Sequence, residues 1–307
     1  MDHNHNYENE KAAYIAIVGR PNVGKSSLLN RLIGAKLAIV SRKPQTTRTR
    51  IMGVWTEGDT QLVFIDTPGL MKPRNPLGDF MVRSVTQSVA GVDACLLVTE
   101  ANTPISKADE DLIARFKSLG LPAVLAINKI DLLEDKSLLM AQIAELSGRY
   151  DFDAVVPVSA RDGNGMEALK DELKKLAMPG GHLFPPDTLT DQSERTLAAE
   201  MVREKILRFT EQEIPHGVAV VTERMREEEG ITRVDCTIYC ERAPHKGILI
   251  GKGGSMLKKI GSKAREDMER FFDTKIDLQL WVKVKEDWRQ RPETLASLGF
   301  DKRDLEN

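Results

Sequence analysis

The sequence predicts an α/β protein of two domains, a mostly parallel, doubly wound sheet followed by a smaller α+β domain. Its 307 residues are enough for about two domains of roughly 150 residues each. Over the first 180 residues, short apolar runs alternate with longer helical patterns, which is typical of β-α-β units. Between Met178 and Asp187, three prolines and two glycines in ten residues interrupt this pattern, so we expect neither helix nor strand there and place the domain boundary in this segment.

Composition excludes several classes of protein. Hydrophobic residues make up 41% of the chain and charged residues 29%, which is ordinary for a globular protein and excludes a disordered or collagen-like one. The net charge of -2 provides no global attraction to nucleic acid or membrane, so any site for a polyanion must be a local cluster. Three cysteines are too few for a disulfide framework, and we expect Cys236 and Cys240 to be packed thiols. Without a signal peptide or an apolar run of about 18 residues, we expect a monomeric cytoplasmic protein, with contact to the inner face of the cell membrane left open.

The elements of the first domain follow from its apolar runs. A hairpin is expected at Ile51–Thr56 and Gln61–Phe64, because Glu57-Gly58-Asp59 between them is a typical turn. Helical periodicity covers Lys25–Ile33, Lys107–Leu119 and Asp135–Ser147. Near-continuous apolar runs predict strands buried on both faces at Tyr14–Val18, Leu62–Ile65, Ala94–Val98, Ala123–Ile127 and Val155–Val158.

The second domain has a different order of elements. A helix is expected within Ser193–Gln212, with Ala198, Val202, Ile206 and Phe209 on one face. Two strands, Val218–Glu223 and Arg233–Tyr239, precede a glycine-rich turn, a helix ending near Phe272 and a strand at Ile276–Val284. We therefore divide the chain into a tail at 1–12, a first domain at 13–180, a linker at 181–192, a second domain at 193–290 and a C-terminal tail with a short helix at 291–307.

The strongest motif is Gly19-Arg-Pro-Asn-Val-Gly-Lys-Ser26, which matches G-x-x-x-x-G-K-[ST] between a predicted strand and a predicted helix. Gly19 and Gly24 allow the backbone N–H groups to curl around phosphate, and the following helix directs its positive end at the same anion. Lys25 can reach the β- and γ-phosphates, and the hydroxyl of Ser26 can bind Mg²⁺. The motif predicts a nucleoside triphosphate site.

Two further motifs also follow predicted strands. Asp66-Thr-Pro-Gly69 places a carboxylate where it can hold Mg²⁺ and a glycine whose N–H can approach the γ-phosphate. Asn128-Lys-Ile-Asp131 provides an aspartate that can accept both N–H groups of guanine. Adenine would leave that carboxylate unpaired, so the motif favours GTP over ATP. Ser159-Ala160 can support the base through a backbone N–H. Because ligands bind at the carboxyl ends of parallel strands, we expect all of these residues to meet there.

This set of motifs resembles the translation-factor class of GTPases, and Arg20-Pro-Asn-Val23 with Gln45-Thr-Thr-Arg48 resembles the branch that contains the Era, Der and MnmE families. One N-terminal GTPase domain followed by a small domain is similar to the Era family, from about Tyr14 to Phe300. The resemblance implies a GTPase with a slow intrinsic rate that needs Mg²⁺, held by Ser26, Thr47 and Asp66, and catalysis by Lys25, Thr47 and Asn22. The expected GTP-binding residues are Gly19, Arg20, Pro21, Asn22, Val23, Gly24, Lys25, Ser26, Ser27, Asp66, Thr67, Pro68, Gly69, Leu70, Asn128, Lys129, Ile130, Asp131, Ser159 and Ala160.

The resemblance also identifies the switch segments. Switch I is residues 42–51, in which Thr47, with Thr46 as the alternative, joins Mg²⁺ to the γ-phosphate; switch II is residues 69–83. Leu70 stands where Ras-like enzymes have a glutamine that orients the attacking water, and leucine cannot form that hydrogen bond. In related potassium-dependent GTPases, an asparagine at the place of Asn22 helps to hold K⁺, so K⁺ is a candidate cofactor.

In the second domain, Ile248-Leu-Ile250 and Gly251-Lys-Gly-Gly254 resemble the loop of KH domains, and the order α-β-β-α-α-β resembles the type II KH fold. From Arg242 to Arg265 there are seven basic residues and no acidic one. KH domains clamp about four nucleotides of single-stranded nucleic acid at this loop. The expected RNA-binding residues are Ile250, Gly251, Lys252, Gly253, Gly254, Lys258, Lys259 and Lys263.

Together these observations predict a GTP-hydrolysing switch that binds single-stranded RNA. The resemblance to the Era family implies that this RNA is the 3′ end of the 16S rRNA, and that the partner is the small ribosomal subunit during its biogenesis. The alternative is a signalling or cell-cycle GTPase whose second domain binds a protein or the membrane surface.

Overall fold

The structure is a computed structural model, and it describes residues 9–41, 43, 46–69, 77, 81, 87–89, 91–135, 137–298 and 300. The described residues belong to two compact units. The first draws on residues 1–38, 47–72 and 81–191, and the second on residues 39–46, 73–80 and 192–307.

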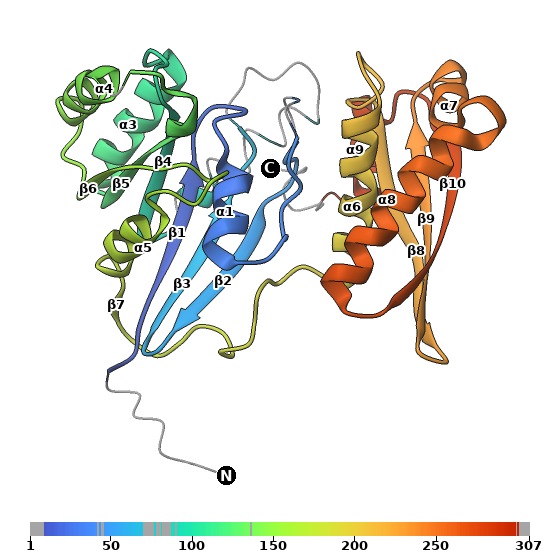
Figure 1. Ribbon diagram of the computed structural model, residues 1–307, viewed down its shortest axis with the longest axis horizontal. Coiled ribbons are helices and arrows are strands. Elements are labelled where there is room, and N and C mark those ends of the chain that lie inside the picture. Colours follow the sequence, from blue (N-terminus) through green and yellow to red (C-terminus); the bar gives the residue numbers. More distant parts are fainter. Residues whose placement is uncertain are drawn as a thin grey trace, which may run out of the picture. The chain divides into compact units, whose positions relative to one another are not determined.

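The first unit is built on a seven-stranded sheet with the order β2-β3-β1-β4-β5-β6, beside which β7 pairs with β1 (Figure 1). Strands β1, β3, β4, β5 and β6 run parallel, whereas β2 and β7 are antiparallel to their partners. The predicted doubly wound sheet is confirmed. The strands are β1 Lys11–Val18, β2 Ile51–Glu57, β3 Thr60–Asp66, β4 Ala94–Glu100, β5 Ala123–Asn128, β6 Ala154–Pro157 and β7 Met178–Pro179.

Helices cover both faces of this sheet, as the unbroken apolar runs of its central strands require. Helices α1 (Lys25–Ile33) and α5 (Met166–Lys174) pack on one face. On the other face, α3 (Lys107–Leu119) and α4 (Ser137–Ser147) share a core with alternate residues of β1, β4 and β5. This arrangement leaves the carboxyl ends of the parallel strands free to build a site.

Two sequence predictions in the first unit can be compared with its geometry. The predicted hairpin is confirmed, with β2 and β3 antiparallel and Gly58 at φ +57° in the turn. Helix α4 begins at Ser137 rather than at Asp135, because the Asp135 carboxylate accepts hydrogen bonds from the backbone N–H and the hydroxyl of Ser137.

The prediction that Met178–Asp187 contains no strand is wrong for its first two residues, which form β7 against β1. The rest of the predicted linker is hydrogen-bonded to the first unit. The Gln61 amide donates to the carbonyl of Phe184 at 2.9 Å and accepts from the N–H groups of Leu183 and Phe184. The N–H of Val54 donates to the carbonyl of Leu189 at 2.9 Å. Residues up to Asp191 therefore pack with the first unit.

The second unit is a three-stranded sheet with the order β10-β9-β8, covered by helices (Figure 1). Strands β8 and β9 are antiparallel, and β9 and β10 are parallel. The element order α-β-β-α-α-β confirms the predicted type II KH fold. Its elements are α6 Glu194–Phe209, β8 Val218–Glu228, β9 Ile231–Cys240, α7 Ala243–Ile250, the 3₁₀ turn η3 Lys252–Gly254, α8 Ser255–Phe272 and β10 Lys275–Val284.

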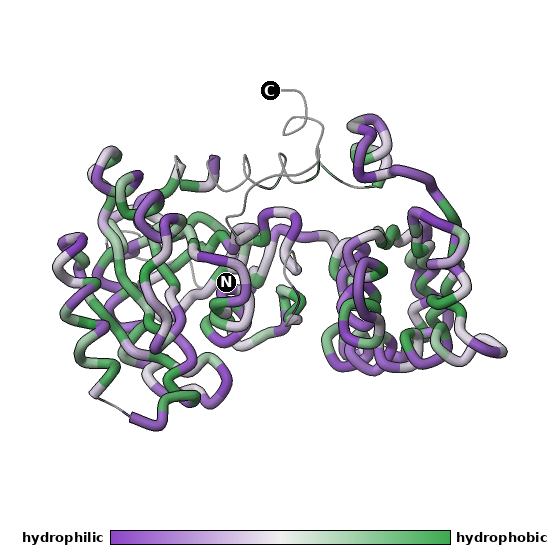
Figure 2. The backbone as a smooth tube through the Cα atoms, turned by 90° about the horizontal axis from the view of Figure 1, so that it is seen from above, coloured by the Kyte–Doolittle hydropathy of each residue, from purple (hydrophilic) through white to green (hydrophobic). Residues whose placement is uncertain are grey.

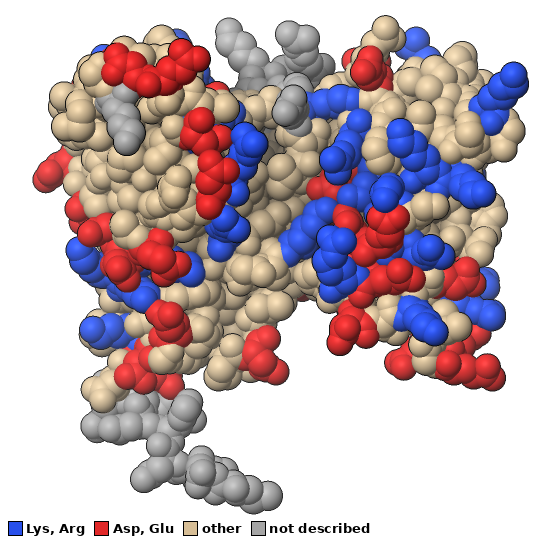
Figure 3. Space-filling view, in the orientation of Figure 1, with Lys and Arg blue, Asp and Glu red and all other residues tan. Residues whose placement is uncertain are grey.

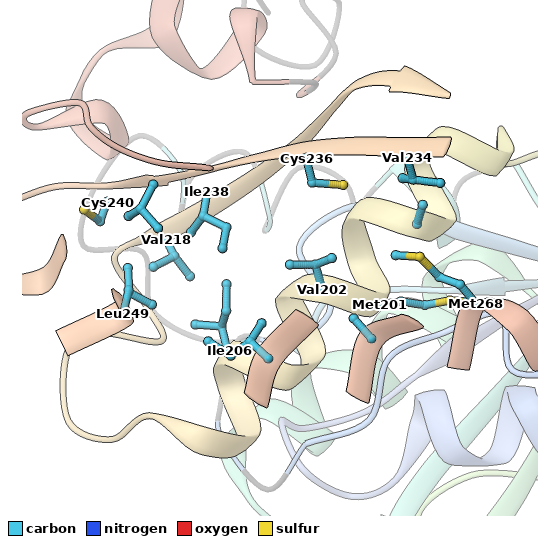
Figure 4. Close-up of a cluster of buried hydrophobic side chains, with 14 of the residues drawn as sticks. Met201, Val202, Ile206, Val218, Val234, Cys236, Ile238, Cys240, Leu249 and Met268 are labelled. Atoms are coloured by element: carbon cyan, nitrogen blue, oxygen red, sulfur yellow. The ribbon is translucent and has the colours of Figure 1, made fainter. Parts of the chain in front are cut away.

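The core of the second unit lies between its sheet and its helices (Figure 4). Val202 and Ile206 of α6 pack against Ile238 of β9, as the predicted helical face requires. Cys236 and Cys240 are buried in the same core, and burial raises the pKa of the Cys236 thiol to about 11. The prediction of packed thiols is confirmed.

The residues after β10 fold back on the second unit. They form the 3₁₀ turn η4 Trp288–Gln290 and helix α9 Pro292–Ser297. The indole N–H of Trp288 donates to the carbonyl of Gly217 at 3.0 Å, and its ring stacks on Phe300 with centroids 6.2 Å apart. Phe300 and Leu295 are buried, so the described part of the predicted C-terminal tail belongs to the packed unit.

Hydrophobic and hydrophilic residues are interleaved along the chain in both units (Figure 2). The strands β3, β4 and β5 of the first unit are mostly apolar, whereas β8, β9 and β10 of the second unit also carry charged residues. Among the described residues, no helix has both the length and the apolar character that crossing a bilayer demands.

Candidate functional site

The first motif forms a loop between β1 and α1. Gly19 has φ +149° and Gly24 has φ +101°. A Cβ on Gly19 would lie 2.3 Å from the carbonyl oxygen of Val98, and one on Gly24 would lie 2.2 Å from the amide nitrogen of Asn128. Both positions therefore require glycine. No side chain caps the start of α1, so its first N–H groups point into the loop as an anion site.

Lys25 lies inside this loop. Its amine donates to the carbonyl oxygens of Gly19 and Arg20, each at 3.0 Å. Burial lowers the pKa of Lys25 to about 8, while the charge of Asp66 acts in the opposite direction. The loop thus holds the Lys25 amine with little water around it. The phosphates of a nucleotide would supply the negative charge that stabilises its protonated form.

Three oxygen ligands meet beside Lys25. The hydroxyl of Ser26 donates to Oδ2 of Asp66 at 2.6 Å and lies 2.8 Å from the hydroxyl of Thr47, which is 3.3 Å from the same Oδ2. Oδ1 of Asp66 is buried and has no hydrogen-bond partner among the described residues. Burial raises the pKa of Asp66, and the charge of Lys25 opposes that shift. A carboxylate and two hydroxyls around an orphaned oxygen fit Mg²⁺, which prefers oxygen ligands.

The second motif lies against the first. A Cβ on Gly69 would come within 2.7 Å of the Cα and N of Pro21, so only glycine allows this approach. The hydroxyl of Thr67 donates to the carbonyl of Ile17 at 2.9 Å, which fixes the end of β3 beside β1. Ser27 lies in the first turn of α1, and Pro68 is buried beside Thr67. Leu70 and nearly all of the predicted switch II lie outside the described residues.

The remaining predicted residues form a pocket at the ends of β5 and β6. The Asn128 amide donates to the carbonyl of Val23 at 2.8 Å and accepts from the N–H of Ala160 at 3.0 Å. The hydroxyl of Ser159 donates to Oδ1 of Asp131 at 2.8 Å. Asn128 therefore joins the phosphate loop to the strand ends, and Ser159 orients the carboxylate of Asp131 through one of its oxygens.

A tight turn positions Asp131. Lys129 has φ +66°, and its amine lies 2.8 Å from the carboxylate of Glu100. The N–H of Ile130 donates to the carbonyl of Val158 at 3.3 Å. The structure thus brings together the described members of the predicted GTP site, from Gly19 to Ala160.

Two charged contacts were not expected from the sequence. Arg161, which directly follows Ser159-Ala160, lies 3.6 Å from Oδ2 of Asp131. Arg20 is ion-paired with the buried Asp109 at 3.1 Å, and Asp109 also caps α3 in a box with Ser106. The S-x-x-D pattern ahead of an apolar helix predicts the capping box but not its link to the phosphate loop.

In the second unit, the glycine-rich turn joins α7 to α8. Gly251, Gly253 and Gly254 have φ of +74°, +58° and +79°. Lys252 and Gly253 are exposed, and helix α8 begins at Ser255 without a side-chain cap. Exposed N–H groups at a helix start suit a phosphate. Basic side chains gather along the upper part of α8 (Figure 3).

Beside this turn, a groove of about 320 Å³ runs between α8 and the edge strand β10. Of the predicted RNA-binding residues, Gly254 and Lys258 line it. Lys259 instead places its amine 4.4 Å from the ring centroid of Phe209, Lys263 is ion-paired with Glu266 at 2.7 Å, and Ile250 packs on the core. The other lining residues include Arg265, which the sequence places in the basic run, and seven that no sequence pattern marks, namely Leu257, Gly261, Ser262, Ile276, Asp277, Leu278 and Leu280.

Comparisons with known proteins agree with this description. Residues 14–129 match the family described as 50S ribosome-binding GTPase, and residues 213–289 match the KH domain. The chain is 47% identical to GTPase Era of Ruminiclostridium cellulolyticum over 94% of its length and 97% of the relative's length. It is 45% identical to GTPase Era of Alkaliphilus oremlandii over 95% of its length and 99% of the relative's length.

Two solved structures are similar over nearly the whole chain. One is a point variant of Aquifex aeolicus Era bound to GDP and AlF4⁻, with a TM-score of 0.91 and 38% identity over 94% of this chain and 99% of that one. The other is Era in complex with MgGDPNP and nucleotides 1506–1542 of 16S ribosomal RNA. It has a TM-score of 0.91 and 37% identity over 95% of this chain and 99% of that one.

Proposed function

The chain belongs to the Era family of GTPases, and from this membership we propose a GTP-driven switch that binds the 3′ end of 16S rRNA during assembly of the small ribosomal subunit. The observation that carries the GTPase activity is the buried, unpartnered Oδ1 of Asp66 beside Ser26 and Thr47 in the described part of the chain. Such a set of oxygens is what a Mg²⁺-nucleotide requires next to a phosphate loop.

Each group of the chain has a separate task in hydrolysis. Lys25 and the N–H groups at the start of α1 bind the β- and γ-phosphates. Ser26 and Thr47 present hydroxyls, and Asp66 holds them in place through its carboxylate. Mg²⁺, when bound there, neutralises charge that develops on the phosphates. Asp131 accepts the two guanine N–H groups and so selects GTP.

Asp66→Asn tests this assignment. Without the carboxylate, the hydroxyls lose their charged acceptor and the metal loses a ligand or its support, so we expect GTP hydrolysis to fall by at least about a hundredfold. The matched control is Asp59→Asn in the exposed turn between β2 and β3, which should hydrolyse GTP at the parent rate. An Asp66→Asn protein with the parent rate and the parent Mg²⁺ requirement would contradict the metal assignment.

Potassium is a further part of the proposal. Asn22 lies in the phosphate loop at φ +67°, a left-handed conformation that asparagine tolerates better than most residues. We infer that K⁺ accelerates hydrolysis relative to Na⁺, with Asn22 holding the ion, and that the intrinsic rate is slow because Leu70 cannot orient water. Single-turnover rates in KCl and NaCl, for the parent and for Asn22→Ala, test this. Equal rates for the parent in both salts would refute it.

The groove of the second unit supports the RNA part of the proposal. Exposed lysines and a helix start lie at one end of it, and apolar side chains of β10 form its floor, a combination that suits phosphates together with unstacked bases. We further propose that the protein is monomeric and acts in the cytoplasm, with no second chain needed to complete either site.

RNA binding is tested with a probe that spans nucleotides 1506–1542 of 16S rRNA, across a salt series and with GDP or a non-hydrolysable GTP analogue. We expect tight binding whose logarithm falls linearly with the logarithm of salt concentration. Competition by anionic lipid vesicles tests whether the same basic surface also contacts a membrane. An RNA affinity that does not change with salt concentration would instead favour a protein partner for the second unit.

A further inference from the structure

The sheet of the second unit has a face that points away from its helices. Alternate residues of β9 and β10, among them Cys236 and Ile238, pack inward with the helices in the core. The residues between them therefore point outward. We call this outward surface the open face, and its central residues are Val221, Thr237, Tyr239, Trp281 and Lys283.

Trp281 is unusual on this face because 46% of it is exposed. It is in register with Thr237 of β9, which in turn is in register with Val221 of β8. Thr237 points outward and yet is only 2% exposed, so its neighbours cover it. The indole thus lies over the sheet and still presents a large apolar surface to solvent.

A second aromatic residue and one lysine lie in the next row of the open face, and a further lysine lies against that aromatic ring. Tyr239 lies two residues along β9 from Thr237 and is in register with Lys283, which is exposed. The amine of Lys285 lies 5.3 Å from the centroid of the Tyr239 ring. Aromatic rings on neighbouring strands of an open sheet, with lysines beside them, form the kind of platform on which single-stranded RNA stacks its bases.

Acidic groups limit the size of this platform. The hydroxyl of Tyr239 donates to Glu223 at 3.3 Å, and Asp235 lies in the row beside Trp281, in register with Gln279 and Arg224. The part of the open face that carries both an exposed indole and an exposed lysine is therefore limited to two cross-strand pairs, Trp281 with Thr237 and Lys283 with Tyr239. That area has room for about one or two bases, because a base and an indole are of similar size.

The open face is continuous with the groove. Leu278 and Leu280 of β10 line the groove, and Trp281 is the next residue along the same strand. The side chains of Leu278 and Leu280 face the helices, whereas that of Trp281 faces the other side of the sheet, so RNA that leaves the groove has to turn around the edge strand β10 to reach Trp281. Asp277, which points outward like Trp281, already lines the groove, so the groove extends to this edge. The two surfaces can therefore bind successive parts of one RNA molecule.

We propose that the open face is a second RNA subsite, in which a base next to those in the groove stacks on Trp281 and its phosphate contacts Lys283. This inference rests on the proposed RNA-binding function. It adds a contact for longer RNA that the KH-type groove alone does not provide.

The experiment compares two RNA probes. One spans nucleotides 1506–1542 of 16S rRNA, and the other is a four-nucleotide piece of it, about the length that a KH groove holds. Trp281→Ala should weaken binding of the long probe by at least about fivefold, whereas Trp281→Phe should stay close to the parent. The short probe should bind all three proteins equally. Trp55→Ala, which removes an aromatic residue from the first unit, is the matched control and should bind both probes as the parent does.

Fluorescence gives a second measurement. The chain has three tryptophans, and Trp288 is fully buried. Stacking on Trp281 should quench indole emission when the long probe is added, and Trp281→Phe should remove that quenching. If Trp281→Ala does not fold by circular dichroism, Lys283→Gln replaces it and should weaken the long probe about twofold with a smaller salt dependence.

The outcomes separate this inference from the function on which it rests. A folded Trp281→Ala protein that binds the long probe as tightly as the parent, with quenching retained in Trp281→Phe, overturns the subsite and leaves the groove intact. That is also the result expected if the open face serves a protein partner. A parent protein that binds neither probe overturns the proposed RNA function itself.

Discussion

The nucleotide site of the first unit and the groove of the second unit are built to bind phosphate in opposite ways. In the nucleotide site the charged and polar groups are buried and hydrogen-bonded to one another, as Lys25, Asp66 and Asn128 show. At the groove, Lys258 of the lining and Lys252 of the adjacent turn are both exposed, and the side chains that β10 contributes to the lining are mostly apolar. The first design fixes a single ligand by geometry, whereas the second attracts a polyanion through charge that salt screens.

The variant with the largest expected effect on the nucleotide site, and not on the groove, is Asp131→Asn. Asp131 is oriented by Ser159, and in the proposed function it accepts the guanine N–H groups, one of which an asparagine would oppose with a donor. We expect GTP affinity to fall by about a hundredfold or more, because a buried polar group without its partner is heavily penalised, and xanthosine triphosphate to become the preferred nucleotide. Competition of XTP against labelled GTP measures this. RNA binding is the control and should not change, while unaltered GTP preference would place base recognition elsewhere.

The reciprocal test places negative charge in the second unit. Replacing Lys252 and Gly253 together by Asp removes a cation and adds two anions at the start of α8, so RNA affinity should fall at least about tenfold and the salt slope should flatten. Both positions are exposed, and a Cβ on Gly253 meets no atom within 4 Å, although its φ of +58° is one that aspartate adopts with some strain.

Filter binding over a salt series measures that effect, with circular dichroism to verify folding. Basal GTP hydrolysis should remain at the parent rate, because every described residue of the proposed GTP site belongs to the first unit. A folded variant that binds RNA like the parent would show that the glycine-rich turn is only a turn.

The two sites also differ in how well the sequence predicts them. Gly19, Lys25, Asp66 and Asp131 follow strand ends in fixed motifs, and parallel strands bring their carboxyl ends to one edge, so topology alone assembles them. The floor of the groove depends on how α8 packs on β10. Nothing local marks Leu278 as a lining residue, because its alternation in the strand equally predicts a core position.

The same contrast bears on two further predictions. The sequence predicts that Lys258, Lys259 and Lys263 bind RNA as one basic cluster, and of the three only Lys258 lines the groove, whereas Lys259 and Lys263 lie together on a neighbouring face of α8. The strand β7 was missed because its pairing with β1 is made across more than 160 residues, which no local pattern can show. The run of basic residues predicts that a basic surface exists, but tertiary packing determines which of its residues line the groove.

A test by pH uses the burial of Lys25, which lowers its pKa from 10.5 to about 8. A bound nucleotide needs the charged amine, so binding takes up a proton above that pKa, and affinity for GDP should fall about tenfold between pH 7 and pH 9. For the nucleotide-free protein, the unfolded chain binds more protons from about pH 8 to 10.5, so this lysine contributes rising stability with pH in that window.

Calorimetry of GDP binding across this range measures the effect. Lys25→Arg is the matched variant, since arginine stays charged, and its affinity should not fall with pH in this way, whatever its absolute value. A parent protein whose GDP affinity is constant from pH 7 to pH 9 would show that Lys25 remains charged in the empty loop.

The smallest expected effect separates two lysines of one helix. Lys258 lines the groove beside Gly254, whereas Lys263 lies outside its lining and is held 2.7 Å from Glu266. Each Gln substitution removes one positive charge from α8, so a binding surface that works through overall charge would lose affinity equally from both.

A groove that binds phosphates at defined positions predicts unequal losses. Lys258→Gln should weaken RNA binding about threefold and reduce the salt slope by about 0.7, the value for one contact to a single strand. Lys263→Gln should leave both within error, because its charge is already largely neutralised by Glu266. Equal losses from the two variants would mean that the second unit attracts RNA by its overall positive charge. In that case only the nucleotide site would bind phosphate at defined positions.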